Sequence, residues 1–279
     1  MTDYSHVSRE DLISRSKIPI EVVDTEDDIY HDMARVMLEE IKKNNASDKP
    51  TVLIVPVGPV YQYRRFVRLV NREKLNLKRL YIIGMDEYMV DRQNMVDITH
   101  PLSFRGFMDR ELYDCLEPDL TVPPENRFFP EPGNESKIEG IIQQLGGVDI
   151  AMGGIGICGH IAFNEPPEPD ECITDAQFSD LPTRVLKLSR ETLTINSVTA
   201  MGGYIDGIPK YCVTVGMREI LSARKIRFYL NREWQRGIVR KICLGGVTAS
   251  VPASFFQQHP DALLTIASYV AEPPVGALR

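Results

Sequence analysis

The sequence lacks any apolar run of about 18 residues, the length at which a helix can span a membrane. Its first residues are polar and charged, which excludes the apolar core of a secretory signal peptide. It also lacks an excess of positive charge, because a net charge of −7 provides no general attraction to nucleic acid or to an anionic membrane surface. We therefore expect a soluble cytoplasmic protein whose partners include no nucleic acid and no membrane.

Cysteine is sparse, and its spacing excludes two common roles. The five cysteines are an odd number, are widely separated and include no C-x-x-C pair. This pattern indicates reduced thiols and argues against a disulfide framework or a zinc site. The five histidines are scattered as well, so the sequence predicts no metal centre.

Short apolar runs alternate with helical patterns along most of the chain. Helices are expected after Thr25, from about residue 60 to 72, from Phe104 to Cys115, and from near Met217 and Glu233. This alternation predicts an α/β fold, a three-layer sandwich whose mostly parallel, doubly wound sheet is covered by helices on both faces. The apolar runs predict strands at residues 51–55, 79–83, 148–152, 184–188, 211–215, 226–230 and 263–267.

The length and the composition, 43% hydrophobic and 25% charged, are ordinary for a globular protein. The chain shows no internal repeat and no interdomain linker, so residues 20–279 are expected to form one α/β domain. The apolar residues of segment 1–19 show neither helical nor strand periodicity. Residues 1–19 are expected to be an N-terminal extension that lies on the surface of the domain or on a neighbouring subunit.

The segment GGIGICGHIAFNEP, residues 153–166, directly follows one of the predicted strands. Glycines at a strand end allow positive φ angles and let a ligand approach the backbone closely. Gly154, Gly156 and Gly159 are therefore candidate ligand-binding residues. Because open α/β sheets bind ligands at the carboxyl ends of their strands, this segment is the first candidate for a functional site.

Gly154, Gly156 and Gly159 also match the pattern G-x-G-x-x-G, which would suggest a dinucleotide-binding site. Such a site needs a helix after the glycines and an acidic residue at the end of the next strand, about 20 residues on. Here Pro166, Pro167 and Pro169 interrupt the chain before such a helix could form. The nicotinamide interpretation is therefore disfavoured.

Five side chains are candidates for chemistry at this edge of the sheet. His160 and Glu165 share the glycine-rich segment, and a carboxylate beside an imidazole can fix its tautomer and stabilise its charged form. Asp86 and Glu87 follow another predicted strand, and one of the two should face the crevice because successive extended side chains point to opposite sides. Lys210 directly precedes a strand and could supply the positive charge that an anionic substrate needs.

These motifs together resemble those of the glucosamine-6-phosphate deaminases, within the superfamily that includes 6-phosphogluconolactonase and ribose-5-phosphate isomerase. Residues 153–166 match the family motif G-G-x-G-x-D-G-H-I-A-F-N-E-P at all but one defined position. Residues 85–88 match M-D-E-Y, residues 208–211 resemble V-P-K-Y, and residues 100–108 resemble H-P-x-S-x-x-x-F-M. The likeness extends from about Ile20 to the C-terminus, and the F-N-E-P ending favours the deaminases over the lactonases.

The resemblance implies conversion of an amino-sugar phosphate to a ketose phosphate and ammonia, without metal or organic cofactor. His160 would open the pyranose ring, Glu165 would orient it, and Asp86 would move a proton between the first two sugar carbons. Lys210 would contact the phosphate, and Gly58 lies in the loop that corresponds to the phosphate-binding loop of the family. The resemblance also implies a homo-oligomer, since the bacterial deaminases commonly assemble as hexamers.

Three positions depart from the family pattern. Cys158 stands where the family has an aspartate, and a neutral thiol cannot supply the charge of that carboxylate. The P-T-G-G-T-P loop is replaced by the shorter sequence P-V-G-P at residues 56–59. Val198 stands where the family has an arginine that binds phosphate.

These departures leave two hypotheses open. The first is an active amino-sugar isomerase or deaminase whose substrate differs from glucosamine 6-phosphate. The second is a catalytically weakened homologue that binds a sugar ligand for regulation. A lactonase-like hydrolase of a sugar acid is a more distant third interpretation.

Overall fold

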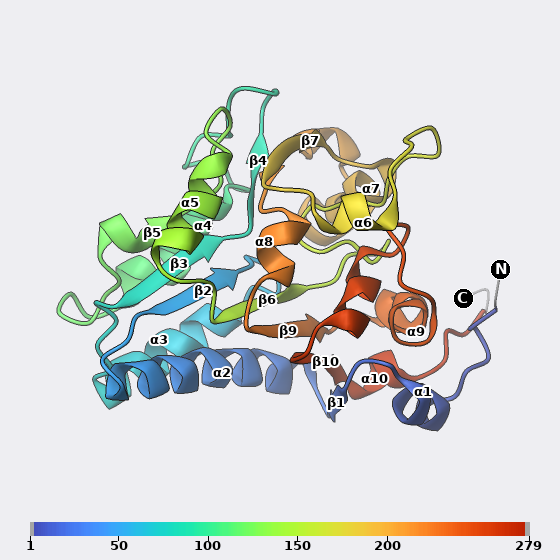
Figure 1. Ribbon diagram of the computed structural model, residues 1–279, viewed down its shortest axis with the longest axis horizontal. Coiled ribbons are helices and arrows are strands. Elements are labelled where there is room, and N and C mark those ends of the chain that lie inside the picture. The colour runs from blue at the N-terminus through green and yellow to red at the C-terminus, as the bar shows by residue number, and fades with distance from the viewer. Residues whose placement is uncertain (1–2, 277–279) are drawn as a thin grey trace.

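A computed structural model describes residues 3–276, so the first two residues of the expected extension and the last three of the expected domain lie outside it. Its centre is a seven-stranded sheet in the order β1-β10-β9-β6-β2-β3-β5, and every neighbouring pair is parallel (Figure 1). The predicted α/β fold with a mostly parallel sheet is confirmed. The strands of this sheet are β1 (Ile20–Val23), β2 (Thr51–Val55), β3 (Leu80–Gly84), β5 (Arg127–Phe128), β6 (Ile150–Gly154), β9 (Lys225–Leu230) and β10 (Ala262–Ala267).

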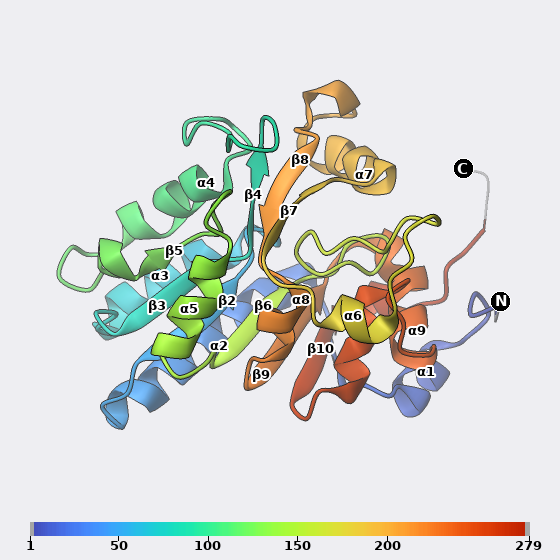
Figure 2. The ribbon, with the colours of Figure 1, turned by 45° about the horizontal axis from the view of Figure 1, so that its top comes forward.

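A second, smaller sheet stands beyond the carboxyl ends of the large one (Figure 2). It consists of β4 (Asp86–Met89), β8 (Tyr211–Thr214) and β7 (Arg184–Lys187), all antiparallel. The strands predicted at 184–188 and 211–215 were expected in the large parallel sheet, and this expectation was wrong. An apolar run indicates a buried strand, but it carries no information on which sheet that strand joins.

One residue joins the two sheets. The N–H of Met85 donates to the carbonyl of Val55 in the large sheet, at 3.0 Å, while its carbonyl accepts from the N–H of Val215 beyond β8, at 2.7 Å. The chain therefore passes directly from β3 into β4, with no connecting loop. Asp86, the next residue, begins the small sheet at the edge where the glycine-rich loop leaves β6.

Helices cover both faces of the large sheet, with α2 and α3 on one side and α5 and α8 on the other (Figure 2). The α-helices are α1 (Arg9–Arg15), α2 (Glu26–Ala46), α3 (Gln62–Glu73), α4 (Phe104–Glu111), α5 (Ser136–Gln144), α6 (Asp175–Ser179), α7 (Arg190–Ala200), α8 (Met217–Leu221), α9 (Arg236–Leu244) and α10 (Ser268–Ala271). In the described part of the chain, no helix combines the length and the apolar character needed to cross a membrane.

Local sequence explains where several helices begin. Thr25 caps α2 as predicted, and its side chain and that of Asp28 satisfy each other's backbone N–H groups in a capping box. The expected N-terminal extension contains a helix, α1, which its lack of period did not indicate. Leu12 of α1 is fully buried and belongs to the main core, so this segment packs on the domain itself.

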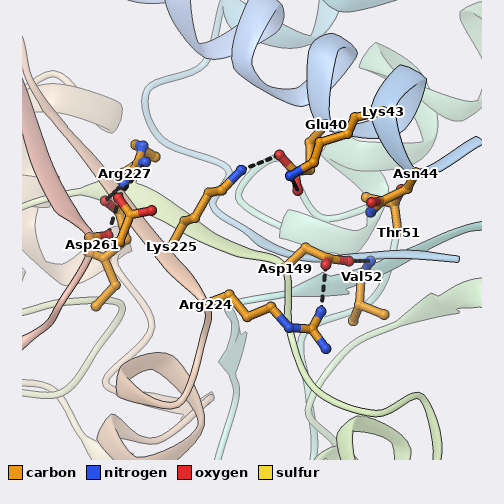
Figure 3. Close-up of polar contacts among 11 residues, drawn as sticks. Glu40, Lys43, Asn44, Thr51, Val52, Asp149, Arg224, Lys225, Arg227 and Asp261 are labelled. Atoms are coloured by element: carbon orange, nitrogen blue, oxygen red, sulfur yellow. Dashed lines mark hydrogen bonds and ion pairs between the residues drawn. The ribbon is translucent and has the colours of Figure 1, made fainter. Parts of the chain in front are cut away.

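Ion pairs gather at the amino ends of the strands, opposite the glycine-rich loop (Figure 3). Asp149 accepts hydrogen bonds from the N–H of Val52 at 2.8 Å and from Arg224 at 2.6 Å, and Lys225 pairs with Glu40 of α2. Asp149 thereby extends the pairing of β2 with β6 by one residue before the strand ladder begins at Ile150. These contacts tie the amino ends of the strands together and to α2.

Candidate active site

The glycine-rich loop after β6 folds back on itself to place His160. The N–H of Gly156 donates to the carbonyl of His160 at 3.0 Å, and the N–H of Gly159 donates to the carbonyl of Gly156 at 2.9 Å. Gly159 has a φ of +80°, a left-handed conformation that glycine adopts without strain. At Gly156 a Cβ would overlap the imidazole of His160, so only glycine leaves room for the ring there.

Three chain segments meet beside this loop. A Cβ on Gly154 would lie 3.4 Å from the carbonyl oxygen of Gly58, so the loop after β2 touches the end of β6. On the other side, a Cβ on Gly153 would lie 3.2 Å from the sulfur of Met85. The structure therefore brings the predicted residues Gly58, Gly154 and Asp86 to one edge of the sheet, as expected from the positions of their strands.

His160 and Glu165 form a nearly buried pair. Nδ1 of His160 lies 3.2 Å from Oε2 of Glu165, and the two side chains are 10% and 9% exposed. Burial raises the pKa of Glu165, but the adjacent His160 and the polar groups of Thr192 and Ser189 outweigh that effect and lower it below its ordinary value. Glu165 is therefore ionised at neutral pH, and its charge favours a proton on the neighbouring imidazole nitrogen, while Oε2 itself accepts no hydrogen bond from the described residues.

The first turn of α7 closes over this pair. The N–H of Ser189, the N-cap residue, donates to Oε1 of Glu165 at 3.4 Å. The hydroxyl of Thr192 lies 3.3 Å from Nδ1 of His160 and is fully buried. A carboxylate near the amino end of a helix is also stabilised by the helix dipole. Figure 2 shows α7 beside the small sheet.

Asp86 is the second acidic group at this edge and is 7% exposed. Burial, reinforced by the charge of Glu87, raises its pKa well above the usual range, and no hydrogen bond from residues 3–276 opposes the shift. The charges of Asp86 and Glu165 both add to the burial that raises the pKa of the Cys212 thiol. In the strand pairing, Asp86 lies opposite Thr214 of β8, and the hydroxyl of Thr214 accepts from the N–H of Phe163 at 3.1 Å. The segment that carries Glu165 therefore meets the small sheet at the level of Asp86.

Glu87 points away from Asp86, as the alternation of an extended chain predicts. Its fully buried carboxylate accepts hydrogen bonds from the backbone N–H groups of Phe104 and Arg105 and from the hydroxyl of Ser103. The guanidinium of Arg105 adds an ion pair at 3.1 Å. Glu87 therefore holds the amino end of α4, and Asp86 remains the candidate for chemistry.

Cys158 lies in the loop beside these acids. Burial and the nearby carboxylates of Glu165 and Glu191 raise the pKa of its thiol to about 11. The thiol is therefore neutral under ordinary conditions and contributes no charge to His160.

Lys210 and Val198 lie on the protein surface, away from Asp86 and the His160–Glu165 pair. Lys210 is exposed and precedes Tyr211, whereas Asp86 pairs with Thr214 at the other end of β8. At about 3.4 Å per residue, the backbone of Lys210 lies roughly 13 Å along the strand from the level of Asp86. Val198 is 63% exposed and lines a hollow of about 300 Å³ with five other residues, which are Ile157, Arg190, Glu191, Thr194 and Ile195.

The contribution of α7 was missed by the sequence analysis. Its residues Ser189 and Thr192 touch the His160–Glu165 pair, and the only sequence signal for them was a serine able to cap a helix directly after a predicted strand. The sequence of α7 is rich in threonine and contains asparagine, serine and valine, which weakens its helical signal.

The arrangement is suited to moving protons. It offers an ionised carboxylate beside an imidazole and a second carboxyl group with a raised pKa, the environments that acid–base catalysis uses. Within residues 3–276, no three His, Cys, Asp or Glu side chains are grouped so that they could hold a metal ion.

Comparisons with known proteins agree with this chemistry. The chain is 31% identical to a glucosamine-6-phosphate deaminase of Shewanella loihica over 236 residues, which cover 84% of this chain and 81% of the relative. It is 27% identical to a glucosamine-6-phosphate deaminase of Clostridium perfringens over 245 residues, 85% of this chain and 93% of the relative. No protein-family model matches the chain.

Solved structures show the same fold. A monomeric glucosamine-6-phosphate deaminase of the NagB superfamily superposes with a TM-score of 0.77 and 25% identity, over 90% of this chain and 98% of that one. A 6-phosphogluconolactonase from Trypanosoma brucei gives a TM-score of 0.64 at 16% identity, over 92% and 98% of the two chains, a likeness of fold alone.

Proposed function

Because the chain belongs to the glucosamine-6-phosphate deaminase family, we propose that it is an enzyme that converts an amino sugar and water into a ketose and ammonia. One observation supports this proposal above the others. The buried carboxyl of Asp86 and the His160–Glu165 pair lie at the same edge of the sheet, where Thr214 pairs with Asp86 and accepts a hydrogen bond from Phe163 of the glycine-rich segment. Isomerisation needs one group that opens the sugar ring and another that moves a carbon-bound proton.

His160 is the proposed ring-opening group. Its Nδ1 faces Glu165, so Nε2 is the nitrogen left to take the proton of the anomeric hydroxyl and to return a proton to the ring oxygen. Glu165 stabilises the imidazolium that exists between these two transfers. The product of this step is the open-chain aldehyde.

Asp86 is the proposed carbon base. It removes the proton from C2 as the aldehyde oxygen at C1 takes up a proton, which gives an enolamine. It then delivers a proton to C1 as the nitrogen releases one, which gives the ketose-level imine at C2. Water then adds to that imine, and ammonia leaves as the C2 carbonyl forms. The raised pKa of Asp86 suits this role, because a carboxyl that both takes and returns a proton works best when its pKa is close to the working pH.

We propose that the substrate differs from glucosamine 6-phosphate at its anionic end. Val198 replaces the family arginine, the loop at 56–59 is short, and Lys210 is the matching cation that remains. A lysine offers a point charge to an anion, without the bidentate hydrogen bonds that an arginine forms. The loop glycines Gly58, Gly154, Gly156 and Gly159 are the proposed backbone surface for the sugar.

The test is ammonia release across a panel of phosphorylated and non-phosphorylated amino sugars. We expect at least one member to be deaminated by the wild-type protein and not by Asp86→Asn. Binding of a sugar without turnover of any member would instead support the weakened, regulatory homologue. Opening of a sugar lactone without ammonia release would support the hydrolase interpretation.

Two further features are part of the proposal. We propose a homo-oligomer, of the hexameric type that the resemblance to the bacterial deaminases implies, while the superposed deaminase structure is that of a monomeric enzyme. Light scattering that gives the mass of one chain would refute it. A cytoplasmic location is supported by five unpaired cysteines and is checked by cell fractionation.

A further inference from the structure

Helix α7 touches both halves of the proposed active site through one of its faces. Thr192 and Asn196 are four residues apart and therefore lie on the same side of the helix. Thr192 contacts Nδ1 of His160 at 3.3 Å, and the amide of Asn196 donates to the hydroxyl of Tyr88 at 2.8 Å. Tyr88 lies two residues after Asp86 on β4, so α7 bridges the strand of the carbon base and the loop of the ring-opening histidine.

The surroundings of Nδ1 determine where His160 carries its proton. This nitrogen faces two oxygen atoms, Oε2 of Glu165 at 3.2 Å and Oγ1 of Thr192 at 3.3 Å. Of the two contacts only the one with Thr192 has the geometry of a hydrogen bond, because Oε2 of Glu165 has no hydrogen-bond partner among the described residues. The charge of the carboxylate favours a hydrogen on the nearest ring nitrogen, and the hydroxyl of Thr192 supplies the acceptor for it. The hydroxyl of Thr192 can accept from the same N–H while its own hydrogen turns toward Glu165. A buried hydroxyl in this position therefore favours one tautomer.

We propose that Thr192 is a positioning residue of this enzyme, which holds His160 in the tautomer with hydrogen on Nδ1 and keeps Nε2 free for the sugar. The inference deepens the proposed function and rests on it where catalysis is concerned. The placement of Thr192 itself rests on geometry, since its side chain is fully buried between α7 and the loop. Its N–H is held by the capping hydroxyl of Ser189 at 3.1 Å, which fixes its position in the first turn of the helix.

Other titratable groups near Glu165 do not fix the tautomer of His160. The thiols of Cys158 in the loop and Cys212 on β8 are neutral, because burial raises the pKa of both. Glu191 of α7 lies near Cys158, and Asp86 of β4 lies near Cys212. Loss of the Thr192 hydroxyl should therefore raise the pKa of Glu165 and move the acidic limb of the activity profile to higher pH.

The first experiment reads the tautomer directly and needs no substrate. Ring ¹⁵N shifts of His160 are assigned by their loss in His160→Asn, then compared in wild type, Thr192→Val and Thr192→Ser. We expect hydrogen on Nδ1 in wild type and in Thr192→Ser, and a mixture of tautomers in Thr192→Val. The same tautomer in all three proteins would overturn the proposal, whether or not the protein is a deaminase.

The second experiment uses whichever amino sugar the panel identifies as a substrate. Thr192→Val keeps the shape of threonine and removes one hydrogen-bonding group, so kcat should fall about tenfold with little change in KM. Thr192→Ser should recover most of the rate. Thr199→Val is the matched control, because Thr199 is exposed on the same helix and, within residues 3–276, its hydroxyl bonds only to carbonyls of that helix.

Each outcome of the kinetic experiment decides the proposal. Equal losses in Thr192→Val and Thr192→Ser, with an unshifted pH profile, would show that the residue only fills space. A panel with no substrate would refute the deaminase function, and the ¹⁵N comparison would still test the tautomer.

Discussion

The imidazole of His160 lies against the backbone of Gly156 and occupies the space that a side chain at Gly156 would need. The φ angle of Gly156 lies outside the left-handed region, so the backbone itself would accept any residue. Glycine is therefore required at position 156 because a larger residue would collide with the histidine ring.

Gly156→Ala should displace His160 while leaving the fold intact. Because positioned acid–base groups contribute about 10²–10⁴-fold in rate, we expect turnover to fall by about 100-fold or more. The measurement is kcat together with thermal unfolding. Gly140→Ala in α5 is the control, since a Cβ there meets no atom within 4 Å, and its activity should match wild type.

Asp86→Asn should remove activity and stabilise the protein. A base that cannot accept a proton loses about 10²–10⁴-fold in rate. The folded-state pKa of Asp86 is raised, so the stability contributed by its neutral form is present at low pH and is lost as pH rises above the unfolded value of about 3.9. An amide avoids that loss, so Tm at pH 8 should exceed that of wild type, and the difference should shrink toward pH 3. A Tm difference that does not depend on pH would contradict the raised pKa.

Cys158→Asp should restore a negative charge beside His160. The wild-type thiol is neutral, with a pKa near 11, so the new carboxylate would raise the basicity of the imidazole and move the pH optimum upward. Cys158→Ser is the control, because it changes the polarity without the charge. Identical pH profiles in all three proteins would mean that Cys158 only packs as a small apolar side chain.

Glucosamine 6-phosphate should bind the wild-type protein weakly, and Val198→Arg should bind it more tightly. A hydrogen bond to a charged group contributes roughly 1.5–3 kcal/mol, so one restored arginine should improve the dissociation constant about 10- to 100-fold. Calorimetric titration measures both values, with Thr199→Arg as a control for added charge on the same helix. Micromolar binding and fast ammonia release by wild type would show that the phosphate is held by other residues.

Glu87→Ala should destabilise the fold without altering the chemistry directly. Its carboxylate holds four donors from residues 103–105, and removing one partner of a buried ion pair costs about 3–5 kcal/mol. Urea unfolding should show this loss, while kcat per folded molecule changes only a few-fold. A catalytic defect as large as that of Asp86→Asn would show that both acids take part in the reaction.

Much of the large sheet could be predicted from the sequence. A strand that is buried on both faces consists of consecutive apolar residues, which are easily recognised. Residues 51–55 were expected as a strand, and β2 has those bounds with every residue buried. The strand β4 was missed because it begins with Asp86 and Glu87, two acids that an apolar-run criterion rejects but that are both buried in the structure. Tertiary contacts outweighed local propensity there.

The candidate site could be predicted only in part. Strand ends placed Asp86, His160 and Glu165 at one edge, since parallel strands end together. Helix α7 was missed because its threonines and valine are weak helix formers. Packing of Leu193 and Met201 against the aromatic cluster of Tyr88 and Phe163 supports it instead, and such contacts between distant segments leave no local trace in a sequence.

Met85 is the residue at which the backbone leaves the large sheet and enters the small one. The two proposed catalytic groups are attached to different sheets. Asp86 belongs to the small sheet, and His160 belongs to a loop of the large one. The spacing between the carbon base and the ring-opening histidine therefore depends on the junction at Met85 and on the hydrogen bonds that tie this loop to the small sheet, from Phe163 to Thr214 and from Asn164 to the carbonyl of Val215. A substitution that tilts the small sheet, even one at its far end near Lys210, would change the reaction geometry without altering any residue that touches the sugar.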